Sequence, residues 1–122
     1  MSAVFARVRL VWLEEPNQPG DVESQLLIDL KIDSDTREVI GAHPAFGLLG
    51  SINSGEMYPF VLRADGRVDF GSSHEDASER YWGSNIRKRV MKKGELVTIE
   101  EEEGPSTYRV ESVAVLGEGE LD

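Results

Sequence analysis

The residues best suited to bind a charged ligand lie in one short segment that combines cations with aromatic rings and contains no acid. It comprises Arg80, Tyr81, Trp82, Arg87, Lys88, Arg89, Lys92 and Lys93. Cations that contact phosphates, together with rings on which bases stack, are typical of proteins that bind single-stranded nucleic acid. The same composition is also typical of a solvated face, or of cations that neutralise a neighbouring acidic stretch while the rings lie in the core. One function hypothesis is therefore that this segment binds single-stranded nucleic acid or another polyanion.

An acidic run follows directly and carries the opposite charge. Residues 94–122 contain nine acids against one cation, and four of the acids are consecutive: Glu100, Glu101, Glu102 and Glu103. The whole chain has a formal net charge of -10, which repels nucleic acid at long range. Segregated charge steers association and fixes orientation more than it adds affinity. Our leading hypothesis is a non-catalytic interaction module, a small acidic β domain whose four glutamates bind a protein partner, such as an inhibitor or immunity-type protein that blocks a basic target.

Known catalytic and metal-binding motifs are incomplete in this chain. The pair His74-Glu75 begins like a zinc protease motif, but Ser78 stands where the second histidine must lie to share a helix face. Asp33 and Asp35 begin like a calcium loop whose later positions hold the wrong residue types. There is no cysteine, which excludes thiolate chemistry and disulfides. We expect no metal, no cofactor and no catalytic residue, and an enzyme without a recognisable motif remains the third hypothesis because carboxylates are abundant.

The length of 122 residues fits one small domain, residues 1–122. A chain of this size buries enough surface for a core without cross-links. The first residues mix arginines into an apolar run and place glutamates after it, which is typical of neither a secretory signal nor a transit peptide. No stretch approaches the roughly 20 apolar residues of a membrane-spanning helix. From the sequence we expect a soluble, cytoplasmic protein.

The elements that must position these residues are predicted most clearly at the carboxy-terminal end of the chain. Residues 95–102 and 107–116 are rich in β-branched and aromatic side chains, which favour strands. Gly104-Pro105 lies between them and indicates a chain reversal. A four-residue loop, 103–106, would place Glu100 opposite Arg109 and Ile99 opposite Val110. This register joins apolar groups to each other and adds one cross-strand ion pair.

Further strands follow from period-two alternation of apolar side chains. Residues 3–13 and 25–33 both alternate in this way, which is the signature of half-buried strands. Residues 58–71 form a second hairpin, because two apolar runs flank Asp65-Gly66, a dipeptide that favours tight reversals.

Four segments are less clear. Residues 41–57 form either a short helix after Pro44 or an irregular loop, and we expect Phe46, Leu48 and Leu49 in the core. The capping-box pattern at Ser73 predicts a helical turn through Arg80. Residues 85–93 fit a helix or a strand, and their alternation favours a strand. Residues 116–122 are expected to be a frayed acidic tail.

Together these elements predict a mainly β fold, a small antiparallel β-barrel or sandwich of about six or seven short strands with one or two short helical turns. On architecture alone, we expect the barrel to close in an SH3-like or OB-like manner.

Overall fold

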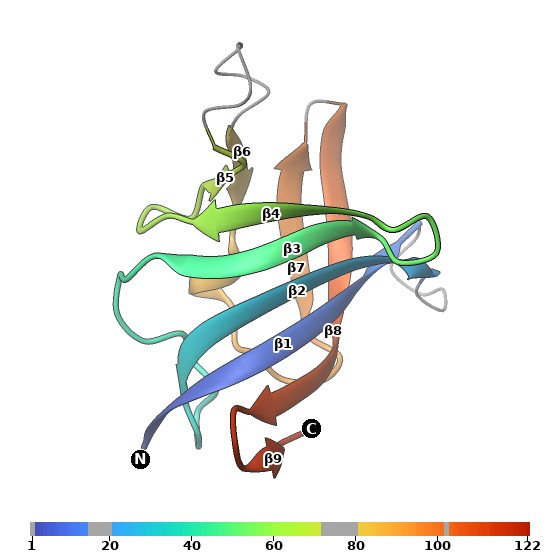
Figure 1. Cartoon of the computed structure of the whole chain (residues 1–122). Helices are drawn as coiled ribbons and strands as arrows, with labels where there is room; N and C mark the ends of the chain where they lie inside the picture. Colours follow the sequence, from blue (N-terminus) through green and yellow to red (C-terminus); the bar gives the residue numbers. More distant parts are fainter. Residues whose placement is uncertain (1, 15–20, 72–80, 102) are drawn as a thin grey trace.

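The structure, a computed structural model, describes residues 2–14, 21–71, 81–101 and 103–122. It is built almost entirely of antiparallel strands (Figure 1). In chain order these are β1 (Ala3–Leu13), β2 (Asp21–Asp33), β3 (Ala45–Ser51), β4 (Glu56–Leu62), β5 (Val68–Asp69), β6 (Tyr81–Ser84), β7 (Leu96–Glu101), β8 (Gly104–Val115) and β9 (Gly119–Glu120). One 3-10 turn, η1 (Ile86–Lys88), precedes β7.

Each strand pairs with the next one in the sequence, and β1 also pairs with β8. This last pairing closes the first eight strands into a barrel, so the prediction of a small antiparallel β-barrel is confirmed. The connectivity is an up-and-down meander and not the Greek-key closure of an OB-like barrel. The strand count exceeds the expected six or seven, partly because β3 forms in a segment that the sequence left unassigned.

The core lies inside the barrel and is built by alternation along the strands. Ala6, Val8 and Leu10 of β1 are buried, and so are the alternate residues of β2. The inward side chains form a single cluster, which includes Leu26, Ile28, Leu30, Ile32, Phe60, Leu62, Val68, Ile86, Met91, Val97, Ile99, Tyr108, Val110 and Val113. The interior of an eight-stranded barrel is just wide enough for side chains to fill it. The prediction of strands at residues 3–13 and 25–33 is therefore confirmed. The strict alternation of β1 ends at a register shift beside Leu10, after which Val11 and Leu13 are buried as well.

The carboxy-terminal hairpin forms, but its predicted register is wrong. Thr98 lies opposite Thr107 and Glu101 opposite Gly104, so the turn is two residues shorter than expected. Glu100 faces Pro105, and Arg109 faces Leu96. The slip is four residues, an even number, and therefore every side chain keeps its predicted face. Facing was predictable because one side is buried, whereas the register depends on which turn closes the hairpin.

The Asp65-Gly66 hairpin is confirmed. β4 and β5 flank the turn and pair Leu62 with Val68. The Arg67 amide donates to Asp65 Oδ1 at 3.0 Å, and Gly66 has a φ of 91°. A carboxylate that accepts from the backbone two residues on is the Asx turn that favours aspartate at such positions.

Residues 45–51 form β3, neither the short helix nor the irregular loop that the sequence left open. Leu49 is buried as expected, but Phe46 is 68% exposed and Leu48 39% exposed, so their assignment to the core is wrong. The inward positions of β3 are Ala45, Gly47 and Leu49. The ring of Phe60 from β4 occupies the space where a side chain of Gly47 would lie. The larger apolar residues of β3 therefore face outward.

Residues 85–93 do not form the strand that alternation favoured. They form η1 and an isolated bridge between Val90 and Glu38. Ile86 and Met91 are buried against one end of the core, and the Asn85 side chain accepts a hydrogen bond from the Thr98 amide at 2.8 Å. The helical turn expected at 73–80 lies outside the described residues. In the described part of the chain, no helix has the length and apolar character needed to cross a membrane.

The carboxy-terminal segment 116–122 is docked and not frayed. β9 pairs with Ala114 and Val115 of β8. The Asp122 carboxylate accepts from Arg37 Nη1 at 2.6 Å and from the Lys93 amide at 2.9 Å. These contacts hold the pKa of Asp122 below its ordinary value, first through the Arg37 hydrogen bond and then through the Lys93 amide.

Candidate functional site

The predicted basic and aromatic segment is divided between the two ends of the barrel. Trp82 of β6 packs against the core and lies beside Glu101 and Tyr108. Tyr81, the preceding residue, pairs with Asp69, and its ring lies 5.3 Å from the Arg67 guanidinium. The chain then passes through η1 to the opposite end of the molecule (Figure 1). The aromatic rings are therefore not interleaved with the cations, and Arg80 lies outside the described residues.

Two of the predicted anion-binding arginines have intramolecular partners. Arg87 donates to the carbonyl oxygens of His43 at 2.6 Å, Arg63 at 2.7 Å and Leu62 at 3.1 Å. Its burial lowers the pKa of the guanidinium. Arg89 forms an ion pair with Glu95. Arg87 thus ties η1 to neighbouring loops. Among the described cations of this segment Lys88, Arg89, Lys92 and Lys93 are exposed, Arg89 within its ion pair.

The acidic run does not form one continuous ridge in the part of the chain that is described. Glu100 is exposed on the outside of β7, whereas Glu101 follows Val97 and Ile99 on the inward face and lies at the end of the barrel. Glu103 is exposed in the turn, and Glu102 lies outside the described residues. The expected pair between Glu100 and Arg109 is replaced by an Arg109–Glu111 pair at 2.5 Å. Strand alternation separates consecutive glutamates.

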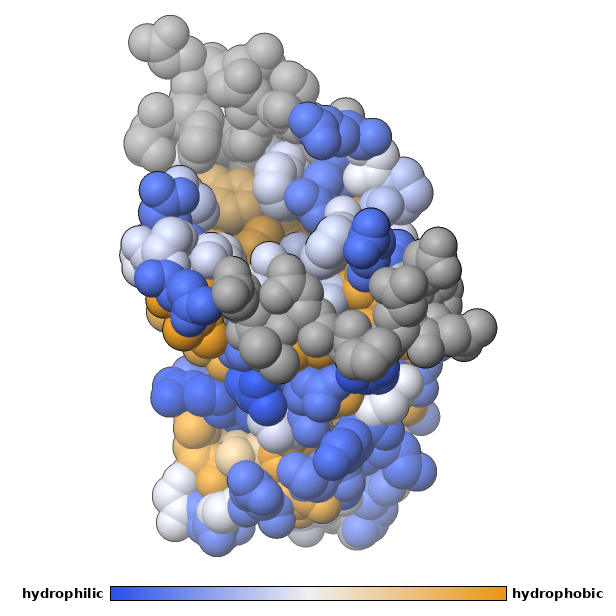
Figure 2. Space-filling view, turned by 90° about the vertical axis from the view of Figure 1, so that its right-hand side faces the viewer, coloured by the Kyte–Doolittle hydropathy of each residue, from blue (hydrophilic) through white to orange (hydrophobic). Residues whose placement is uncertain are grey.

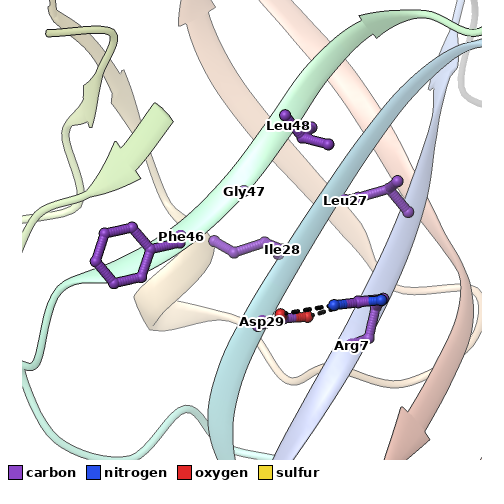
Figure 3. A pocket seen from close by; sticks show the side chains of 7 residues that line it. All are labelled: Arg7, Leu27, Ile28, Asp29, Phe46, Gly47 and Leu48. Carbon is purple, nitrogen blue, oxygen red and sulfur yellow. Dashed lines mark hydrogen bonds and ion pairs between the residues drawn. The ribbon is translucent and has the colours of Figure 1, made fainter. Parts of the chain in front are cut away.

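A hollow of about 280 Å³ lies on the outside of the barrel, over β1, β2 and β3 (Figure 3). It is lined by Arg7, Leu27, Ile28, Asp29, Phe46, Gly47 and Leu48. Arg7 and Asp29 form a two-pronged pair at its lower edge, with Nε–Oδ1 at 2.8 Å and Nη2–Oδ2 at 3.0 Å. The Asp29 hydrogen bond raises the pKa of Arg7. Both side chains are well exposed, so the pair orients the rim of the hollow and adds little stability.

Apolar side chains continue beyond this hollow onto β4. Phe46 lies opposite Val61, and Leu48 lies between Leu27 and Pro59 in the sheet. We call this set, Leu27, Phe46, Leu48, Pro59 and Val61, the Phe46 face. Contiguous exposed apolar surface on a folded domain marks a binding surface more often than chance. This face was not predictable from the sequence, because Phe46 and Leu48 lie in a segment without a clear pattern, where apolar side chains are expected in the core.

No cluster of three or more potential metal ligands occurs among the described residues. No protein-family model, curated protein or solved structure matches this chain. Any function must therefore be argued from the surfaces themselves.

Proposed function

We propose that this protein is a non-catalytic interaction module that binds a basic protein partner through the Phe46 face. The observation that carries the proposal is the exposure of Phe46 and Leu48 beside a hollow that the Arg7–Asp29 pair borders. Large apolar side chains, an adjoining hollow and a polar rim are the usual parts of a protein interface. The partner would insert an apolar side chain into the hollow and align polar groups with the ion pair.

Charge supports the choice of a basic partner. The net charge of -10 accelerates encounter with a cationic surface. Glu100 and Glu103 are exposed on the hairpin of β7 and β8, away from the Phe46 face. In this proposal they steer association and the apolar face holds the complex, which changes the role that the sequence suggested for the glutamates.

We rank the polyanion alternative lower. Arg87 and Arg89 already have partners in the fold, and the aromatic rings lie at the other end of the barrel from the exposed lysines. An exposed trio of lysines without stacking rings is an ordinary solvated surface.

The test compares two double variants with matched changes in polarity. Phe46→Ser with Leu48→Ser removes the apolar face, whereas Ile52→Ser with Leu116→Ser removes two similarly exposed apolar residues elsewhere. Fully burying such a side chain contributes about 1.5–3 kcal/mol. Scaled by their exposed fractions, Phe46 and Leu48 would contribute about 2–3 kcal/mol, which corresponds to an increase in Kd of roughly 30- to 150-fold.

The partner is first identified by capture on the immobilised wild-type chain, then purified and titrated by calorimetry. We expect the loss of affinity in the Phe46 and Leu48 variant only, with unchanged unfolding midpoints in both variants. Glu100→Lys with Glu103→Lys should slow association in low salt and leave dissociation unchanged. If the purified partner binds both double variants equally, the Phe46 face is not the interface. If light scattering shows a dimer that dissociates only in the Phe46 and Leu48 variant, the occupant is a second copy and the proposal of a basic partner is refuted.

A further inference from the structure

A second hollow, also of about 280 Å³, lies at the end of the barrel where β3 turns into β4. Figure 2 looks onto this side of the molecule and shows apolar surface set back between polar side chains in its upper half. The hollow is lined by Ser24, Gln25, Leu49, Gly50, Ser51, Tyr58, Phe70, Trp82, Glu101 and Tyr108. Four of the nine aromatic residues of the chain thus gather here. We call Tyr58, Phe70, Trp82, Glu101 and Tyr108 the aromatic mouth.

Strand alternation brings these side chains together. Tyr58 pairs with Leu49, and it precedes the buried Phe60 by two residues on β4. Glu101 follows the buried Ile99 on β7 in the same way. Trp82 contacts Phe70 edge to face, with ring centroids 4.8 Å apart and planes at 74°. At this end of the barrel, inward-side positions of β4, β6 and β7 therefore hold either an aromatic ring or a carboxylate.

Glu101 is the single charged residue among the described lining residues, and no cation pairs with it in the described part of the chain. Its carboxylate acts on the buried Tyr108 hydroxyl, whose pKa is raised first by burial and then by the Glu101 charge. Tyr108 therefore stays neutral and leaves the negative charge of Glu101 uncompensated. The aromatic mouth is a site of negative potential within a strongly acidic molecule.

Trp82 carries an unpartnered donor in the described part of the structure. Its indole Nε1 is withdrawn from solvent and has no hydrogen-bond partner among the described residues. Buried unsatisfied donors are rare in cores that serve stability alone. An ammonium ion cannot accept a hydrogen bond from this donor, so any contact of a cation with Trp82 is through the ring face.

We propose that the aromatic mouth binds a small organic ammonium ion, with methylated ammonium as the favoured chemistry. Aromatic faces attract cations through the ring quadrupole, and several rings around one cation are the known arrangement for methylated ammonium groups. Glu101 supplies the counter-charge. A bare divalent metal ion is a poorer match, because Glu101 is the one carboxylate among the described lining residues and the other side-chain oxygens there belong to neutral hydroxyl and amide groups. The volume lies just below the usual range of about 300–1,000 Å³ for ligand pockets, which restricts the site to a small ligand.

The test is a titration with choline and with its neutral isostere, 3,3-dimethyl-1-butanol, at constant ionic strength. The readout is the pair of indole N–H signals in the NMR spectrum, assigned with a Trp12→Phe variant because the chain has two tryptophans. We expect choline to shift the Trp82 signal saturably and to bind at least about tenfold more tightly than the isostere, since only choline carries charge. Equal affinity of the two compounds, or no saturable shift up to about 10 mM choline, would overturn the proposal.

Variants locate the effect. Glu101→Gln should weaken choline binding about tenfold, while the adjacent and outward Glu100→Gln should leave it unchanged, because only Glu101 lines the hollow. Tyr58→Leu removes a ring that is 57% exposed and should also weaken binding without altering the fold. If neither Glu101→Gln nor Tyr58→Leu changes the affinity for choline, choline does not bind at the aromatic mouth and the proposal is refuted.

A peptide that contains trimethyl-lysine distinguishes the two sources of the ammonium group. Tighter binding of the peptide than of choline indicates a protein-borne ammonium, and weaker binding indicates a free small molecule. The Phe46 and Leu48 variant should bind choline normally, which separates this site from the protein interface.

Discussion

Replacing Gly47 by alanine tests how tightly the barrel is packed where β3 meets its neighbours. A Cβ at this position would lie 2.4 Å from the Leu27 carbonyl oxygen and 2.5 Å from Cζ of the Phe60 ring. Both distances are far below ordinary van der Waals contact. The oxygen belongs to the backbone of β2, and Phe60 is 3% exposed, so neither neighbour has free space to move into.

The matched control is Gly83→Ala on β6. A Cβ there would lie 3.6 Å from Cβ and Cγ of Glu100, which is ordinary contact. Alanine in a strand is favoured over glycine by about 0.5–1 kcal/mol. Over-packing a filled core costs about 1–3 kcal/mol. The strand preference for alanine applies to both variants and cancels between them. We therefore expect Gly47→Ala to be about 2 kcal/mol less stable than Gly83→Ala, and Gly83→Ala to lose nothing or to gain slightly.

Urea denaturation followed by tryptophan fluorescence measures both variants. With an m-value of about 1–3 kcal/mol per molar, the Gly47→Ala midpoint should lie roughly 1 M below the Gly83→Ala midpoint. A double-mutant cycle with Phe60→Leu separates the two clashes, because a smaller side chain relieves the ring contact and leaves the backbone contact. The reasoning is refuted if Gly47→Ala is as stable as Gly83→Ala, or if the cycle shows no coupling between Gly47 and Phe60.

Two further predictions concern contacts between loops. Asp122→Asn should cost about 1.5–3 kcal/mol at pH 7, because charged hydrogen bonds to Arg37 are lost. The folded-state pKa of Asp122 is depressed, so this stabilisation is complete above the ordinary pKa of about 3.9 and disappears as the pH falls through the lower folded value. Urea titrations across this range should show the wild-type advantage shrinking with acid, and a constant difference would contradict the assignment. Arg87→Ala should lower the unfolding free energy by about 1–3 kcal/mol because four backbone carbonyls, that of Gly41 among them, lose a donor, whereas the exposed Lys88→Ala should change it by less than about 0.5 kcal/mol. Equal thermal midpoints for these two variants would show that Arg87 has no tethering role.

The choice of face along a strand was predictable, because burial of one side imposes a period of two on the sequence. Residues 3–13 and 25–33 are strands for this reason, and Asp65-Gly66 is a turn because its local backbone preferences do not depend on distant residues. Local rules were insufficient where two patterns competed. Residues 85–93 alternate like a strand, but Asn85 and Arg87 find long-range partners in other segments, and the backbone follows those contacts.

The candidate sites depended on the tertiary structure even more strongly. Composition identified an acidic chain with a basic segment, and those facts hold in any fold. The closed barrel determines that Phe46 faces outward and that Arg87 donates hydrogen bonds to backbone carbonyls. It also places Glu101 beside four aromatic rings at one end of the barrel. The sequence by itself determined which residues alternate and where the chain turns. Register and closure decided which of them meet, because a β-barrel brings together strand ends that are far apart in sequence and that no local pattern links.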